Sequence, residues 1–195
     1  MRQTSKTAIL VLILILLPAL PALAQKIELA LGAGGYFPVN VTGAGNAAAI
    51  EGNAAYRIAS VPLLSAYVEV PVVGTFNSNV RTFGLTSSAS YSALFVAPGL
   101  RVKFAPGFFV SPWVAVGGGL AHYSGSSGLR LLSGTDTTNT GVFDYGGGLD
   151  SKIAPYLSVR GEVRDFYSGG LGFNLANFNQ RQHNIVATAG LVLRF

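Results

Sequence analysis

The chain has 195 residues, and Asp, Glu, Lys and Arg make up only 11% of them, against roughly 25% in an ordinary soluble domain. The 13 basic and 8 acidic residues give a formal net charge of +5, but they form no basic run of the kind that binds nucleic acid. Because the chain has no cysteine, disulfides, thiolate metal sites and an acylated lipoprotein anchor are excluded.

The first residues have the composition of an export signal. Two basic residues precede an apolar run over residues 8–17, which leads through two prolines to the sequence A-L-A. A basic start, a short apolar stretch and an A-x-A end are typical of a secretory signal peptide, and the run is shorter than the roughly 20 residues of a membrane-spanning helix. We predict a signal peptide over residues 1–24, cleavage between Ala24 and Gln25, and one mature domain over residues 25–195.

The rest of the chain alternates apolar with polar or small residues at a period of two, which indicates strands. Short connections alternate with long ones rich in Gly, Ser, Thr and Asn, as in barrels with short periplasmic turns and long external loops. The predicted fold is all-β, an eight-stranded antiparallel up-and-down transmembrane β-barrel. The predicted strands are residues 27–37, 47–58, 63–74, 91–104, 108–123, 139–153, 156–167 and 183–195.

The two faces of these strands differ in chemistry. One face is apolar, and the other collects nearly all strand charges together with many glycines. In a lipocalin-like soluble barrel the apolar face would line a ligand cavity, whereas in a membrane barrel it faces lipid and the charges lie inside. The few charges and the long connections at one end only favour the membrane. The predicted lumen charges are Glu28, Glu51, Arg57, Glu69, Arg101, Lys103, Asp144, Asp150, Lys152, Arg160, Glu162, Arg164 and Arg194.

An eight-stranded barrel leaves a lumen only wide enough for side chains, so its charges must pair to be tolerated. We expect Asp150 to face Arg160 across a hairpin, and Glu28 to lie near Arg194 where the first and last strands close the barrel. The seven basic and six acidic predicted lumen residues are nearly balanced, whereas a selectivity filter carries one sign. We therefore predict a salt-bridged, largely closed lumen, with a narrow channel for small solutes as the alternative.

The last predicted strand ends on an aromatic residue. Counting back in twos from Phe195 gives Leu193, Leu191 and further apolar residues, and this pattern resembles the sorting signal of bacterial outer-membrane barrels. Together with the strands around residues 111–119 and 158–165, it makes the chain similar to the small OmpA/OmpX-like outer-membrane barrels. The resemblance implies a place in the bacterial outer membrane, contact with its lipid and lipopolysaccharide, and insertion by the barrel-assembly machinery, which would read Leu191, Leu193 and Phe195. It implies no single activity, and we expect a monomer.

One pair of residues raises the question of catalysis. His122 and Ser124 form an H-x-S pair on the outward face, and a lipid A deacylase barrel uses such a pair with a Glu on the neighbouring strand. Here Asp144 points inward, so we expect no carboxylate to orient the imidazole. Two distant histidines also do not make a metal site. We predict a non-enzymatic protein without cofactor or metal that serves membrane integrity or surface interaction, with a lipid-modifying enzyme as the remote alternative.

Residues near the loop ends of the strands have a further possible role at the membrane boundary. Arg81, Arg130 and Arg181 can meet lipopolysaccharide phosphates, although ordinary solvated loop charges are the alternative, and His183 is a rim residue. Aromatic residues at this end form an interfacial girdle where they face outward. They are Tyr36, Phe37, Tyr91, Tyr123, Tyr145, Phe166 and Tyr167.

Overall fold

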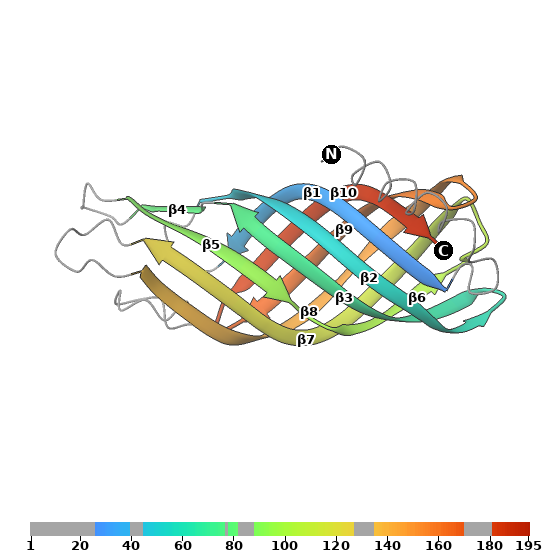
Figure 1. Ribbon diagram of the computed structural model, residues 1–195, viewed down its shortest axis with the longest axis horizontal. Helices are drawn as coiled ribbons and strands as arrows, with labels where there is room; N and C mark the ends of the chain where they lie inside the picture. Colours follow the sequence, from blue (N-terminus) through green and yellow to red (C-terminus); the bar gives the residue numbers. More distant parts are fainter. Residues whose placement is uncertain (1–25, 40–44, 77, 82–87, 127–134, 170–180) are drawn as a thin grey trace, which may run out of the picture.

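Ten strands follow one another along the part of the chain that the computed structural model describes, which is residues 26–39, 45–76, 78–81, 88–126, 135–169 and 181–195. All of them belong to one antiparallel sheet (Figure 1). None of the described residues forms a helix long and apolar enough to cross a membrane. The strands are β1 (Ile27–Val39), β2 (Ala47–Val61), β3 (Leu64–Phe76), β4 (Ser78–Arg81), β5 (Ser88–Val96), β6 (Gly99–Phe104), β7 (Val110–Ser126), β8 (Thr135–Ala154), β9 (Leu157–Ser168) and β10 (His183–Arg194).

The sheet closes on itself as an eight-stranded barrel. The strands β3 and β4 both pair with β5, so they share one strand position in the barrel wall. The strands β5 and β6 both pair with β7 and share another, so the ten strands occupy eight positions. Between β5 and β6 lies Pro98, whose missing N–H interrupts the ladder. The first strand, β1, pairs with the last, β10, and Figure 1 shows the two side by side. This confirms the predicted fold class.

The closing seam depends on a close approach of two glycines. Gly32 of β1 lies opposite Gly190 of β10 in the register. A Cβ atom on Gly190 would collide with the backbone of Leu31 and Gly32, so only glycine fits there without moving the neighbouring strand. The seam ends with two backbone hydrogen bonds between Ile27 and Phe195, of 3.1 and 2.9 Å.

Alternation along the strands separates an apolar outer surface from a polar interior. In β3, for example, Val68, Val70 and Val72 are exposed, whereas Glu69 and Val73 are buried. The same holds around the barrel, where large apolar side chains such as those of Leu31, Leu120 and Val163 face outward and the buried set includes ten Asp, Glu, Lys and Arg residues. Such a surface is typical of a barrel in a lipid bilayer, where an apolar exterior and a polar interior are both stable.

Candidate functional site

The turn end of the lumen holds a cluster that we call the basal cluster, formed by Glu28, Asp150, Arg101, Lys103, Arg160 and Arg194. Glu28 accepts from Arg101 at 2.7 Å, from Lys103 at 2.6 Å and from Arg194 at 3.1 Å. Asp150 binds Arg160 through two contacts of 2.8 and 3.0 Å and Lys103 at 2.7 Å. Two carboxylates thus hold four cations, each carboxylate shared by several strands that are distant in sequence.

Aromatic rings help to hold the excess positive charge of the basal cluster. The Trp113 ring has the guanidinium carbons of Arg101, Arg160 and Arg164 at 5.4, 5.0 and 5.2 Å from its centroid. Its Nε1 donates to Asp150 at 3.2 Å, and Tyr67 has Arg101 at 4.9 Å. Cation–π contacts of this kind are strongest when the cation is desolvated, and Trp113 is only 2% exposed. Trp113 and Tyr67 were not among the predicted lumen residues, although both have the inward parity.

Farther from the turns lies the central cluster, formed by Arg164 with Glu51, Glu69, Asp144 and Glu162. The Arg164 guanidinium contacts Glu69 at 2.7 Å and Asp144 at 2.8 Å, and Glu51 and Glu162 at 3.5 Å each. Glu69 also accepts from Asn53 at 3.0 Å and lies 3.5 Å from Arg101, which links the two clusters. The lumen is therefore polarised, with cations in excess at the turn end and carboxylates in excess at its centre.

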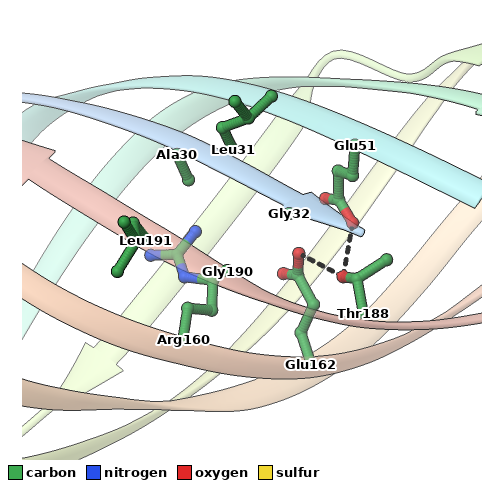
Figure 2. Close-up of a pocket in the computed structure, with 9 residues that line it drawn as sticks. All are labelled: Ala30, Leu31, Gly32, Glu51, Arg160, Glu162, Thr188, Gly190 and Leu191. Carbon is green, nitrogen blue, oxygen red and sulfur yellow. Dashed lines mark hydrogen bonds between the residues drawn. The ribbon is translucent and has the colours of Figure 1, made fainter. Parts of the chain in front are cut away.

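The excess of carboxylates gathers around Thr188 (Figure 2). The Thr188 Oγ1 lies 3.0 Å from Glu51 Oε2 and 3.2 Å from Glu162 Oε1, and both carboxylates point toward it. A hydroxyl has one hydrogen to donate, so it satisfies one of these two contacts at a time. Glu51 Oε1 and Asp144 Oδ1 are buried without a hydrogen-bond partner among the described residues. A small pocket at the β1–β10 seam reaches this group and is also lined by Gly32 and Gly190.

The loop end of the lumen is filled by a layer of aromatic rings, which we call the aromatic layer: Tyr36, Tyr91, Phe95, Tyr123 and Phe166. The rings of Phe95 and Phe166 stack with centroids 4.9 Å apart, and Tyr123 meets Phe95 edge-on at 5.8 Å. Each of the five side chains is at most 3% exposed. Tyr36, Tyr91, Tyr123 and Phe166 therefore face inward and do not belong to the predicted girdle.

Polar groups fix the aromatic layer in place. Tyr123 shares a hydrogen bond of 2.6 Å with Ser168 and accepts one of 2.9 Å from Gln182. Tyr36 donates to Asn184 Oδ1 at 2.7 Å. Because these hydroxyls are bonded to Asn184 of β10, Ser168 of β9 and Gln182, the two tyrosine rings are tied to the wall at both ends. The layer therefore holds its rings in fixed positions above the central cluster.

The structure brings together most of the predicted lumen charges. Glu28, Glu51, Glu69, Arg101, Lys103, Asp144, Asp150, Arg160, Glu162 and Arg164 are at most 7% exposed, and the Arg194 side chain is 13% exposed. The expected partners Asp150 and Arg160 lie directly opposite each other in the β8–β9 register, as do Glu28 and Arg194 in the β1–β10 register.

Two of the predicted lumen residues do not join this network. Arg57 is half-buried and Lys152 is exposed. Each is followed by a shift in the strand register, after Arg57 in β2 and after Lys152 in β8. Because both lie beside short turns at the end of the barrel, their side chains reach solvent instead of the clusters, and this corrects the sequence prediction.

The other predicted residues fall at the ends of the chain and at the rim. Leu191 and Leu193 face outward at 51% and 46% exposure, and Phe195 joins the ladder to β1. Ala24, Gln25 and Arg130 lie outside the described residues, and Arg81 lies in β4.

The H-x-S pair lies on the outer surface, as predicted, and the neighbour of its histidine is an amide. His122 is exposed, and its Nδ1 lies 2.6 Å from Oδ1 of Asn139, the residue opposite it in β8. Asn139 therefore occupies the position from which a carboxylate would orient the imidazole. An amide carries no negative charge to stabilise an imidazolium, and no hydrogen bond joins His122 to Ser124 in the described part of the chain.

Comparisons with known proteins identify the fold. No family model matches the chain, and no curated protein does. Among solved structures, Neisserial surface protein A superimposes with a TM-score of 0.62 at 13% identity, covering 88% of this chain and 99% of that one. The outer-membrane protein OprG from Pseudomonas aeruginosa gives 0.53 at 10% identity, with 88% and 96% covered. The attachment invasion locus protein Ail of Yersinia pestis, in complex with the heparin analogue sucrose octasulfate, gives 0.51 at 13%, with 87% and 99% covered. The chain therefore has the fold of the small bacterial outer-membrane barrels.

Proposed function

We propose that the protein is a non-enzymatic, monomeric barrel of the bacterial outer membrane with a closed lumen, and that it serves membrane integrity or surface interaction. The apolar outer surface supports the membrane location, because large side chains such as Leu31 and Leu120, at 71% and 66% exposure, would be costly in water. The fold shared with Neisserial surface protein A supports the outer membrane in particular.

Two filled levels of the interior, the aromatic layer and the central cluster below it, support the closed lumen. The aromatic layer closes the loop end with five rings that are almost fully buried. Below it, Arg164 is itself fully buried and spans the interior from β9 to Glu69 of β3. Six buried carboxylates face five cations in the two clusters. Among the described residues, the interior therefore has no ring of single sign that would select ions.

The route to the membrane follows from the same proposal. A signal peptide removed after Ala24 would deliver the chain to the periplasm, and the barrel-assembly machinery would read the final strand through Leu191, Leu193 and Phe195. Outer-membrane lipid and lipopolysaccharide would then surround the wall. Support for this role of the final strand comes from its position, because β10 forms the seam that closes the barrel.

Conductance of the purified, folded protein in a planar lipid bilayer tests the proposal. We expect the unaltered protein to be silent and the double variant Phe95→Ala, Phe166→Ala to show discrete openings, since that variant removes the stacked rings at the centre of the aromatic layer. The matched control is Phe37→Ala, which removes an outward ring at the same end and is expected to stay silent. Steady openings of the unaltered protein would support the narrow channel instead.

A further inference from the structure

An acidic residue on the outer surface stands out against the apolar belt around it. In β9, Val159 and Val163 face outward, and Asp165 is the next outward position toward the loops. Its Oδ2 accepts a hydrogen bond of 2.6 Å from the Tyr145 hydroxyl and lies 2.6 Å from His183 Nδ1, and its Oδ1 accepts from the backbone N–H of Asn184 at 3.2 Å. The carboxylate is thus satisfied by three donors and orients the groups around it.

The contact with Asp165 fixes the tautomer and the orientation of the His183 ring. An ionised carboxylate only accepts hydrogen bonds, so the proton of this contact lies on Nδ1 of the imidazole. The Nε2 atom, on the far side of the ring, has no partner among the described residues. The ring packs against Tyr167 with centroids 4.8 Å apart, and the side chain is 37% exposed. His183 is therefore held at the outer surface with Nε2 available to an external group.

A cationic side chain lies beside this histidine. The guanidinium carbon of Arg181 lies 6.0 Å from the centroid of the Tyr167 ring, the same ring that packs against His183. The Arg181 side chain is exposed, and no carboxylate pairs with it among the described residues. The guanidinium offers several N–H donors and positive charge, and the imidazole on the same aromatic ring donates through Nε2 when it holds both of its ring protons, so the two side chains together complement a phosphate group.

The location of this group indicates which kind of molecule carries the phosphate. Tyr167 lies opposite Phe143 in the β8–β9 register, and Phe143 is an exposed apolar residue at 52% exposure. The group thus borders the apolar belt at the loop end, where a bilayer places its headgroups above its acyl chains. We propose that Arg181 and His183, positioned by Asp165, Tyr145 and Tyr167, bind the phosphate of a membrane lipid. This inference rests on the proposed membrane location and is independent of whether the lumen conducts.

Native mass spectrometry of the folded protein, released from a non-ionic detergent, tests this site with three probes. They are phosphatidic acid, diacylglycerol with the same acyl chains, and inorganic phosphate. We expect phosphatidic acid to bind the unaltered protein and diacylglycerol to bind it at least about tenfold more weakly, since charge-assisted hydrogen bonds to the phosphate would be lost.

The variants separate the site from general adsorption of lipid. The double variant Arg181→Gln, His183→Gln is expected to weaken phosphatidic acid binding at least about tenfold. Tyr145→Phe is expected to weaken it less, because it removes one donor to Asp165 and leaves Arg181 and His183 in place. His122→Gln, a histidine on the outer surface of a different strand, is the matched control and is expected to bind as the unaltered protein does. Heat-modifiable electrophoretic mobility verifies that each variant is folded.

Equal binding of phosphatidic acid by the double variant and the unaltered protein would overturn the proposal, as would equal binding of diacylglycerol. Inorganic phosphate distinguishes the two sources of the anion. If it displaces phosphatidic acid at equal concentration, the site takes free phosphate and the lipid assignment is wrong. Openings of the unaltered protein in the conductance experiment would overturn the closed lumen without affecting this result.

Discussion

Glu69 and Glu51 of the central cluster have the same side chain and different surroundings. Exchanging each for glutamine therefore shows how much its partners contribute to the stability of the barrel. Glu69 contacts Arg164 at 2.7 Å, Arg101 at 3.5 Å and Asn53 at 3.0 Å. Glu51 has one long contact of 3.5 Å to Arg164 and shares the single hydrogen of Thr188 with Glu162. Both side chains are at most 3% exposed, so burial itself does not distinguish them.

We expect Glu69→Gln to lower the free energy of unfolding by about 3 kcal/mol, the lower part of the range for removing one partner of a buried ion pair. The loss of the Glu69 carboxylate leaves less negative charge to compensate the buried guanidinium groups of Arg164 and Arg101. Glu51→Gln is expected to change the same quantity by less than about 1 kcal/mol or to raise it, because the substitution removes a surplus negative charge and adds an N–H donor beside Glu162.

Equilibrium unfolding in urea of the barrel reconstituted in phospholipid vesicles measures both values. The chain has one tryptophan, Trp113, which is buried in the lumen, so its fluorescence reports the unfolding of the interior. Glu69→Gln should shift the midpoint to lower urea, and Glu51→Gln should not. Equal losses for the two variants, or a larger loss for Glu51→Gln, would refute the assignment of the surplus charge to the group around Thr188.

Two further predictions concern assembly and the closing seam. Deleting Phe195, or replacing it with Asp, should leave unfolded protein in the periplasm, and heat-modifiable protein in the outer-membrane fraction of the deletion mutant would count against this role. Gly190→Val should abolish folding into vesicles, because a Cβ there collides with the backbone of Leu31, whereas Gly52→Val, where a Cβ meets nothing within 4 Å, should fold. Similar folding yields for both glycine variants, measured by electrophoretic mobility, would show that the seam tolerates a side chain.

The fold and the two faces of the wall could be predicted because each strand carries its own period-two signal. Parity alone places Glu69 inside and Val68 outside, and hairpin geometry alone places Asp150 opposite Arg160. Parity does not give the height of a side chain in the barrel. It therefore assigned Arg57 and Lys152 to the lumen, although the register shifts beside the turns leave them in contact with solvent.

The grouping of the lumen charges could not be predicted, since it depends on contacts across the barrel between strands that are not neighbours. Glu28 of β1 meets Arg101 and Lys103 of β6, and no hairpin or seam relates these strands. The same is true of Phe95 and Phe166, whose stacking converts rim aromatics into an internal layer. Asn139 beside His122 is different, because the β7–β8 register alone would have revealed it.

Quenching of tryptophan fluorescence tests whether the barrel wall has lipid outside and a closed interior. Folded protein in vesicles is exposed to iodide in the water or to brominated acyl chains in the lipid, and the control is the double variant Trp113→Phe, Val114→Trp, which moves the tryptophan to an outward position that is 53% exposed. We expect that iodide leaves Trp113 unquenched and that brominated lipid quenches the control more strongly than Trp113. Strong quenching of Trp113 by iodide would contradict the closed lumen, and stronger quenching of Trp113 than of the control by brominated lipid would contradict the assignment of the two faces.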